Sequence, residues 1–515
     1  MSTTLPATTA SPRATVRDWG ALAVLMLPVL LVSIDGTVLG FALPSIAATL
    51  GPTAAQQLWI IDVYPLVLAG LLVSMGSLGD RLGRRRLLLL GSTGFAAMSV
   101  VAAYAPTAGA LIAARAGLGF FGAMLMPSTL SLLRNIFTDP QQRRLAIAVW
   151  ASCFAAGAAL GPIVGGFLLE YFWWGSVFLM AVPVLIPLLV LAPIFVPESR
   201  DPNPGRIDPV SIVLSLLALT PLVYAVKTLA KGGDLVVVAA ALAVGVTATG
   251  LFLRRQLRRP DPMLDVRLFT NRRFSGAVAV NLLSIFSLVG FMFFISQHLQ
   301  LVVGMSPMDA AWALVPGLIT MMAAGLLVVR VVRWIAPSTV VVGGMLIAAA
   351  AYAVVMAFAS PDSTLAVLIA FAMLGIGIGA AETLSNDLIV STVPAEKAGA
   401  ASAVSETAYE LGTVLGTAVL GSILAGAYAA KLVVPAGLTS EQVAAAGETL
   451  AGAHHVATQL PADTADALVR AAGQAFDAGV SVTSAIGVVL MLGAAWIAHR
   501  TLRAPSSSAA TTAAQ

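Results

Sequence analysis

Apolar stretches of about 20 residues or more recur between short polar connections along almost the whole chain, from Trp19 to Leu502. Each stretch can cross a hydrocarbon core about 30 Å thick, because a helix rises about 1.5 Å per residue. The pattern predicts an all-α polytopic membrane protein with fourteen transmembrane helices. These helices are expected at residues 20–46, 56–76, 85–105, 109–132, 144–168, 174–196, 208–229, 234–253, 275–300, 308–329, 338–359, 364–390, 400–428 and 476–502.

The polar remainder consists of two tails and one long connection. Residues 1–18 and 504–515 are rich in Ser, Thr and Ala, and we expect both tails to be disordered. Residues 429–475 form the long connection, in which the amphipathic segment 440–473 predicts short helices. The first apolar stretch is too long for the core of a signal peptide and lacks a cleavage site, so we expect it to remain as a span.

Basic residues are distributed unevenly over the two sides of this helix arrangement. With the N-terminus inside, the cytoplasmic side holds 23 Lys and Arg, whereas the opposite side holds only Lys227, Lys231, Lys431 and Arg470. An excess of basic residues is typical of cytoplasmic loops. The bias predicts a bacterial cytoplasmic membrane protein with both termini in the cytoplasm and the 429–475 connection outside.

Composition excludes several classes of protein. Hydrophobic residues make up 59% of the chain and charged residues only 10%, whereas soluble domains have about 25% charged residues. The net charge of +4 lies in loops beside helices, so it does not indicate a nucleic-acid partner. The sequence has no nucleotide-binding loop and no metal-ligand spacing around its histidines, so it predicts neither an enzyme nor a metal or other cofactor. No feature predicts an obligate protein partner.

The connection between the second and third helices combines glycines, arginines and one carboxylate. The general preference for basic residues in cytoplasmic loops explains the arginines but not the glycines or Asp80. A tight glycine turn that places a carboxylate beside a helix N-terminus and several arginines can latch helices together. The residues of this predicted cytoplasmic gating loop are Gly76, Asp80, Arg81, Gly83, Arg84 and Arg85.

Ionisable residues also occur inside the predicted spans. Arg115 lies in the fourth helix, where a charge costs about 2.5–3.5 kcal/mol and needs a partner or an aqueous cavity. A structural ion pair and a role in proton transfer are both open for it. Glu406 and Glu410 share one face of the thirteenth helix because they are four residues apart. The intramembrane carboxylates are Asp35, Asp62, Glu382, Asp387, Glu406 and Glu410.

The fifth helix carries small residues at regular spacing. Gly157, Gly161 and Gly165 are four residues apart, and such spacing lets two helices approach closely. Pro162 and Gly166 extend this motif with a kink and a further small residue. Helix packing alone accounts for the pattern.

These motifs resemble those of a known family. The loop from Gly76 to Arg86 resembles the signature loop of the major facilitator superfamily, and the run from Gly157 to Gly166 resembles its antiporter motif. The segments Ile34–Thr37 and Trp59–Tyr64 are similar to those of fourteen-helix drug:proton antiporters. The similarity covers nearly the whole chain and is closest to LfrA-type exporters of fluoroquinolones and dyes, followed by QacA-type exporters.

The resemblance implies a fold and a function. In the major facilitator fold, residues 19–200 would form one six-helix half, residues 201–259 two extra helices, and residues 260–503 a second six-helix half. The implied function is export of lipophilic cations, such as dyes, quaternary ammonium compounds and fluoroquinolones, in exchange for protons across the bilayer. The alternative is a related exporter of an endogenous metabolite, an antibiotic or a lipid.

The resemblance also implies roles for single residues. Arg115 is expected to take part in proton transfer, and an acidic residue of the thirteenth helix is expected to couple proton and cation movement. We expect Glu410 to be the main site with Glu406 one turn away. Asp35 is expected across the cavity as a second acidic contact, and Asp62 nearer the outer mouth.

Three further features carry open interpretations. The tenth helix has no acid between Pro316 and Met322, where some family members carry one, which makes binding of dications an open question. The pair His454 and His455 is either a solvated loop, which we favour, or a metal or pH site. Aromatic and methionine side chains of the ninth helix suit either packing or substrate contact; they are Phe291, Met292, Phe293 and Phe294.

Overall fold

The computed structural model describes residues 14–200, 208–230, 233–259, 262, 264–358, 363–393 and 398–502, and at a few helical positions, Asp80 among them, it describes the backbone alone. In these residues, fourteen helices are long and apolar enough to cross a membrane, which confirms the number that hydropathy predicts. The predicted disordered tails lie outside the described residues, apart from residues 14–18, which include the start of the first helix.

The first six spans pack around one buried core, which extends from Ala21 to Val196. Their helices are α1 (Val16–Leu50), α2 (Ala54–Leu82), α3 (Arg84–Ala103), α4 (Ala108–Gly122), α5 (Leu125–Ile136), α6 (Pro140–Tyr171), α7 (Ser176–Leu179) and α8 (Ala181–Phe195).

The last six spans pack around a second core, which extends from Leu268 to Leu502 and also takes in Phe41, Leu43 and Leu58. Their helices are α11 (Arg272–Gln297) with the π-helix η2 (His298–Val302), α12 (Pro307–Val331), α13 (Pro337–Phe358), α14 (Thr364–Ser391), α15 (Ala398–Gly416) with the π-helix η5 (Thr417–Gly421) and α16 (Ser422–Lys431), and α19 (Ala462–Thr501).

Two boundaries in the first half differ from the sequence-based expectation for local reasons. α1 begins at Val16, within the tail expected for residues 1–18, because Thr15 and Asp18 form a capping box at its start. The fourth span is divided into α4 and α5 near Met124. Pro127 lacks a backbone donor and its ring clashes with the carbonyl one turn earlier, which breaks the helix there.

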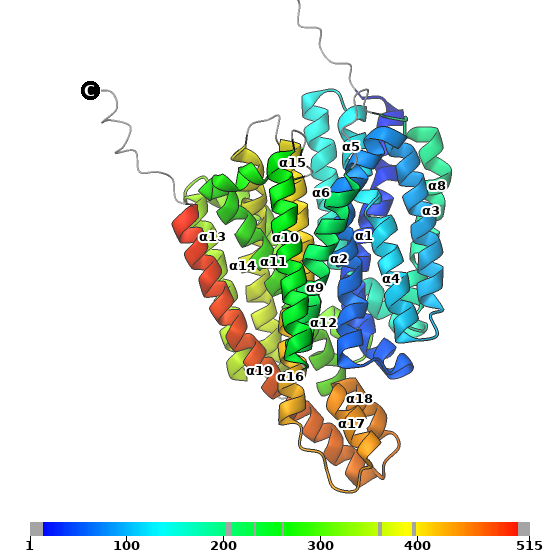
Figure 1. Cartoon of the computed structure of the whole chain (residues 1–515), viewed down its shortest axis with the longest axis vertical. Coiled ribbons are helices and arrows are strands. Elements are labelled where there is room, and N and C mark those ends of the chain that lie inside the picture. Colours follow the sequence, from blue (N-terminus) through cyan, green and yellow to red (C-terminus); the bar gives the residue numbers. More distant parts are fainter. Residues whose placement is uncertain are drawn as a thin grey trace, which may run out of the picture.

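Two further spans, α9 (Pro209–Ala230) and α10 (Leu235–Arg258), pair with each other and are largely exposed. Ser215 of α9 donates a hydrogen bond to the carbonyl of Gly70 in α2 at 3.2 Å. Val223 of α9 packs with Leu66 of α2 and Val414 of α15. The pair therefore covers one side of the seam between the two cores, as Figure 1 shows, and leaves its remaining surface exposed.

The last helix differs most from the sequence-based expectation. α19 begins at Ala462, not near residue 476, because the polar segment before the span is amphipathic and remains helical. Its residues Leu468 and Ala472 are buried in the second core. Together with α17 (Ser440–Glu448) and α18 (Leu450–Ala457), the start of α19 forms a small helical cap. The short helices expected in residues 440–473 are present.

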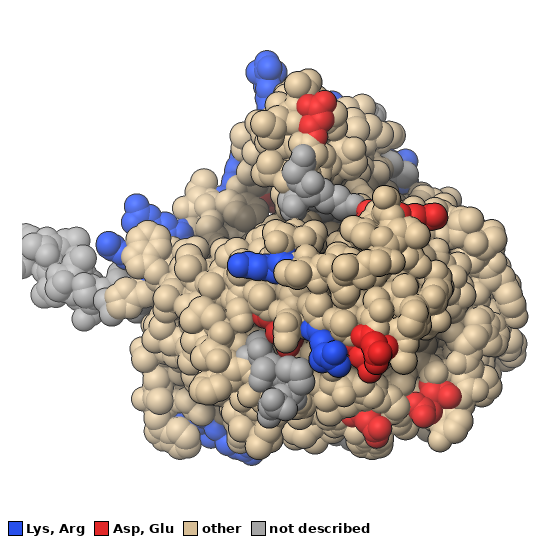
Figure 2. Space-filling view, turned by 90° about the horizontal axis from the view of Figure 1, so that it is seen from below, with Lys and Arg blue, Asp and Glu red and all other residues tan. Residues whose placement is uncertain are grey.

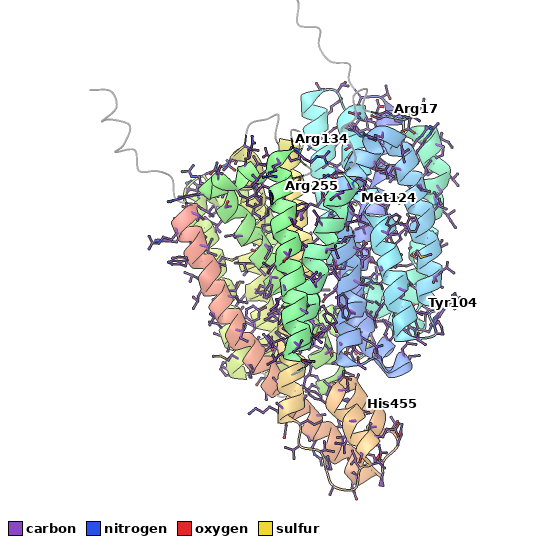
Figure 3. All side chains as sticks on the ribbon, viewed as in Figure 1. Arg17, Tyr104, Met124, Arg134, Arg255 and His455 are labelled. Atoms are coloured by element: carbon purple, nitrogen blue, oxygen red, sulfur yellow. The ribbon has the colours of Figure 1, made fainter. Side chains whose placement is uncertain are left out.

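The bundle has two distinct ends. α1 begins and α19 ends at the same end, called here the terminal side, whereas α17 and α18 lie at the other, called the cap side (Figure 1). Arg17, Arg134 and Arg255 gather on the terminal side, and His455 lies on the cap side (Figure 3). In the view of the cap side in Figure 2, most of the surface is uncharged and charged side chains are scattered.

The two halves meet closely on the cap side. Ser296 of α11 donates a hydrogen bond to the carbonyl of Gly40 in α1 at 2.9 Å. The backbone N–H of Ala54, the first residue of α2, donates to the Glu448 carboxylate of α17 at 2.9 Å. Glu448 thus ties the cap to the N-terminus of α2, where a negative charge is also favoured by the helix dipole. These contacts close the seam on the cap side.

Candidate coupling site

A buried ion pair joins α1 and α4. Arg115 Nη1 lies 2.8 Å from Asp35 Oδ2, and the side chains are 2% and 5% exposed. Arg115 Nε also donates to the carbonyl of Ile60 at 3.2 Å. The guanidinium lies over the ring of Tyr64, 4.5 Å from its centroid, and 6.0 Å from that of Phe178. The partner that the buried arginine requires is therefore Asp35.

Glycines of α6 determine where α1 places Asp35. A Cβ atom at Gly157 would lie 2.8 Å from Ser33 Cβ, and one at Gly161 would overlap Thr37 Oγ1. Ser33 and Thr37 flank Asp35, and they donate hydrogen bonds to the carbonyls of Phe154 and Ala158 in α6. The close packing predicted from glycine spacing is thus present, and it holds the segment of α1 that carries the carboxylate.

The cap-side part of the same motif contacts both halves. Gly165 packs against Val38 of α1, and Pro162 lies within α6 between the two groups of contacts. A Cβ atom at Gly166 would lie 2.9 Å from Ala311 Cβ and 3.0 Å from the carbonyl of Pro307, both in α12. The antiporter motif is therefore an interface of α6 with α1 and, at Gly166, with the second half.

The acidic residues of the second half lie on α14 and α15. Glu406 and Glu410 are one turn apart on α15, and Glu382 lies on α14. Each of the three carboxylates is partly exposed within the protein, and Tyr409 precedes Glu410 directly on α15. Tyr409 contacts Phe154 of α6 with ring centroids 5.9 Å apart. The carboxylates therefore line the interior near the seam.

Tyr64 of α2 lies between these two groups of charged residues. The Arg115 guanidinium lies 4.5 Å from the centroid of its ring, and two residues further along α2 Leu66 packs with Val414 of α15. The sequence marks Tyr64 only as part of a motif and indicates no role for it, because nothing in the spacing of α2 shows which side chains of other helices it meets.

The other two intramembrane carboxylates differ in environment. Asp62 of α2 is fully buried, eight residues after the start of the helix on the cap side. Asp387 of α14 is exposed, near the opposite end of its span. Asp62 takes part in interactions of its own, and its role as an acidic contact stays a prediction.

The predicted gating loop is shorter than expected. α2 continues to Leu82 and α3 begins at Arg84, so Gly83, with φ of 106°, is the whole connection. Only glycine adopts this backbone conformation readily. A Cβ atom there would also lie 2.7 Å from the carboxylate of Glu198. Gly76 lies inside α2, where its nearest neighbour is Pro127, and the side chain of Asp80 lies outside the described part of the chain.

Glu198 supplies the carboxylate seen at the N-terminus of α3. Its Oε1 accepts a hydrogen bond from the backbone N–H of Arg85 at 3.0 Å, and the N–H of Arg84 donates to the carbonyl of Ser199 at 2.9 Å. The Arg85 guanidinium donates to the carbonyl of Val196 at 3.0 Å. The loop is thus latched to the end of the sixth span. Arg81, which is exposed, has further interactions of its own.

The two adjacent histidines of the cap, His454 and His455, differ in their environment. His455 is exposed, whereas His454 is partly buried. Burial lowers the pKa of His454, and a hydrogen bond from its ring N–H to the carbonyl of Leu301 offsets part of this effect. Among described residues, no group of three or more possible ligands could hold a metal ion. His298 of η2 lies 2.9 Å from Asp477 of α19, a pair that sequence spacing did not reveal.

The aromatic residues of α11 are packing residues for the most part. Phe291 is fully buried, and its ring centroid lies 4.7 Å from that of Phe294 and 5.6 Å from that of Phe371. Phe291 and Phe294 belong to the second core, which supports the interpretation that they are packing residues. Phe293 also lines a small pocket on the cap side, with Gln57 and Tyr428.

A bundle of fourteen spans, with an ion pair and several carboxylates in its interior, defines a polytopic membrane transporter. The chain belongs to the major facilitator superfamily, whose family model matches residues 25–417. A solved structure with the same fold is a bacterial homologue of the human lysosomal transporter Spinster, in an inward-facing and unoccupied conformation. It matches with a TM-score of 0.67 and 20% identity over 95% of this chain and 98% of the other.

Curated relatives are multidrug and drug-resistance proteins. The chain is 57% identical to the multidrug efflux pump LfrA of Mycolicibacterium smegmatis, over 96% of this chain and 98% of the relative. It is 38% identical to the methyl viologen resistance protein SmvA of Salmonella typhimurium, over 84% and 87%. It is 32% identical to the tetracenomycin C resistance and export protein of Streptomyces glaucescens, over 79% and 76%. The resemblance that the motifs indicated is therefore confirmed.

Proposed function

We propose that this protein is a proton-coupled multidrug efflux antiporter that exports lipophilic cations, including dyes, quaternary ammonium compounds and fluoroquinolones, across the bacterial cytoplasmic membrane. The observation that carries the proposal is the full-length 57% identity to a multidrug efflux pump. Carboxylates that line the interior, Glu406 and Glu410, support it by providing groups that can bind either a proton or a cation.

Exchange at one carboxylate is the simplest mechanism. Glu410 binds a proton or a cationic compound but not both, so arrival of one releases the other. Glu406, one turn away, is a second group of the same kind. Asp35, which is paired with Arg115, contributes the acidic contact of the first half. Arg115 takes part in proton transfer, because its positive charge balances the negative charge of Asp35. Asp62 is proposed as an acidic contact nearer the outer mouth.

Sidedness follows from the arginine-rich terminal side. We infer that this side faces the cytoplasm, so that both termini are inside and the cap is outside. On this assignment, the conformation with a closed cap side is one in which the outer mouth is shut. The two halves that rock against each other are then residues 19–200 and 260–503, with residues 201–259 at the seam. The loop around Gly83 acts as a cytoplasmic latch during this movement.

Proton-driven ethidium transport by the purified protein in proteoliposomes tests the proposal. We expect ethidium to move against its own gradient when a pH gradient is imposed, and to stop when a protonophore collapses that gradient. Glu406→Gln and Glu410→Gln, singly and together, serve as matched variants, since Gln keeps the shape and removes the titratable group. Export at the wild-type rate by all three variants would show that α15 does not couple the exchange.

Export of an antibiotic or another metabolite is the second candidate function. The 32% identity to a tetracenomycin C resistance and export protein favours it. Metabolite profiling of a deletion strain, compared with dye efflux from the same strain, distinguishes the two. Accumulation of one internal compound with unchanged dye efflux would assign the protein to this second function.

A further inference from the structure

Tyr64 of α2 carries a hydroxyl group that the fold encloses without giving it a partner. The residue is 3% exposed, and its hydroxyl forms no hydrogen bond with any described residue. Its ring lies under the Arg115 guanidinium and meets the ring of Phe95 edge to face, with centroids 6.4 Å apart. The ring is therefore fully used in packing, whereas the hydroxyl is not.

Glycines of α4 hold the tyrosine at this position. A Cβ atom at Gly119 would lie 2.6 Å from the backbone carbonyl oxygen of Tyr64, and one at Gly122 would lie 3.3 Å from its hydroxyl oxygen. The two glycines allow α2 and α4 to approach at this level and leave space for the hydroxyl. The same helix carries Arg115, so α4 fixes the ring and the guanidinium relative to each other.

An unpaired hydroxyl in a buried site destabilises the folded protein, because the group loses its hydrogen bonds to water and gains none. Packing alone would therefore favour phenylalanine, which fills the same volume. The presence of the hydroxyl indicates a partner in another state of the transport cycle.

The helices that pack against α2 carry charged groups from both halves. Asp35 comes from α1 and Arg115 from α4 in the first half, and Glu410 comes from α15 in the second half. Leu66 of α2 and Val414 of α15 pack in one buried cluster, two residues from Tyr64 and four residues from Glu410. Tyr64 is thus located where the charge of Glu410 and the Asp35–Arg115 pair can both reach one hydrogen-bond donor.

We infer that Tyr64 is a positioning residue of the exchange reaction, whose hydroxyl links the protonation state of Glu410 to the Asp35–Arg115 pair. This inference rests on the proposed function. When Glu410 is charged, the hydroxyl donates to its carboxylate. When Glu410 is protonated, the hydroxyl turns to Asp35 and competes with Arg115 for that carboxylate, which loosens the pair. The phenolic proton stays on Tyr64 throughout.

Tyr64→Phe tests the inference, because it removes the hydroxyl and keeps the ring beneath Arg115. Purified protein is measured in three ways: thermal stability, ethidium binding, and proton-driven ethidium transport in proteoliposomes. We expect unchanged or increased thermal stability, a KM within about threefold of wild type, and a kcat at least about tenfold lower. Tyr104→Phe is the matched control, since Tyr104 is 65% exposed at the end of α3 (Figure 3) and should transport at the wild-type rate.

Glu410→Gln is measured in parallel to separate the two proposals. Wild-type kcat in Tyr64→Phe, with transport lost in Glu410→Gln, overturns the inference and leaves the proposed function intact. Loss of thermal stability or of ethidium affinity in Tyr64→Phe, in proportion to the fall in kcat, also overturns it, because the residue would then act through packing or binding. Wild-type transport in Glu410→Gln removes the basis of both.

Discussion

At the scale of single residues, the central feature is a positive charge enclosed by helices with one negative partner. Arg115 and Asp35 neutralise each other at 2.8 Å, and the carbonyl of Ile60 accepts a further hydrogen bond from the guanidinium. Removing one partner of such a pair leaves the other charge buried and uncompensated, whereas removing both does not.

Arg115→Met is therefore expected to destabilise the protein by about 3–5 kcal/mol, and Asp35→Asn to destabilise it substantially as well. The double variant should be less destabilised than the sum of the two single variants, since it leaves no unpaired charge. Thermal unfolding of the four purified proteins in one detergent measures the difference. Strict additivity would show that the pair contributes no coupling energy.

Glu410→Gln is expected to change the pH dependence of drug binding. If a proton and a cationic drug compete for this carboxylate, binding strengthens as the pH rises and the proton leaves, and the Gln variant loses this dependence between about pH 5 and 8. Ethidium fluorescence titrations at several pH values measure it. Asp387→Asn on the exposed part of α14 is the control and should keep the wild-type profile.

At the scale of elements, contacts between neighbouring helices position the charged groups. α6 holds the Asp35 segment of α1 through glycines, and α9 is tied to α10 through Asp208. The Asp208 carboxylate binds Arg255 at 2.8 Å and Arg259 at 2.7 Å, and the hydrogen bond from Arg255 holds its pKa well below the usual range.

Gly161→Ala is expected to reduce ethidium transport at least about tenfold, because its Cβ overlaps Thr37 and separates α6 from α1 beside Asp35. Transport in proteoliposomes is the measurement. Gly250→Ala in α10 is the matched control, since a Cβ atom there meets nothing within 4 Å. Thr37→Ala in the Gly161→Ala background should restore part of the activity, and the absence of any recovery would contradict the proposed contact.

Asp208→Asn is expected to lower stability at pH 7 by about 2 kcal/mol. A carboxylate whose pKa is depressed by folding stabilises the protein above its unfolded pKa, near 3.9, and this contribution is lost as the pH falls toward the folded value. The stability difference between wild type and Asp208→Asn should therefore shrink below about pH 5. Thermal unfolding over this range tests it, with exposed Glu170→Gln as control. A difference independent of pH would contradict the assignment.

At the scale of the whole molecule, the start of α1, the end of α19 and the labelled residues Arg17, Arg134 and Arg255 share one side, and the cap formed by α17, α18 and the start of α19 covers the other. The cap bonds to both halves: Tyr428 of α16 donates to the carbonyl of Ala446 at 2.8 Å, and Glu448 accepts from Ala54. It is therefore a part of the closed seam.

The predicted orientation can be measured by cysteine labelling. In a background in which the single Cys153 is replaced by Ser, His455→Cys on the cap should react with a membrane-impermeant maleimide added to intact cells. Arg17→Cys on the terminal side should react only after the membrane is permeabilised. The reverse pattern would overturn the topology and, with it, the assignment of the shut mouth to the outside.

The sequence by itself determined the number of spans, the helical cap segment and the family. These properties depend on the length of apolar stretches, on the side to which basic residues are confined, and on motifs in which the informative residues are close together in the chain. The largest difference between the predicted and observed helix boundaries is the start of α19, which lies at Ala462. It arose because hydropathy marks where a helix can enter the membrane and not where the helix begins.

Only the tertiary structure decided which polar groups meet. Asp35 and Arg115 are 80 residues apart, Glu198 and Arg85 are 113 apart, and His298 and Asp477 are 179 apart. Spacing along one helix states which residues share a face, but the partner across the interface depends on how closely two helices approach. That approach is determined by small residues packed against distant segments, as at Gly161 and Gly122. The pairing of charges is thus a property of the packed bundle and not of any local pattern.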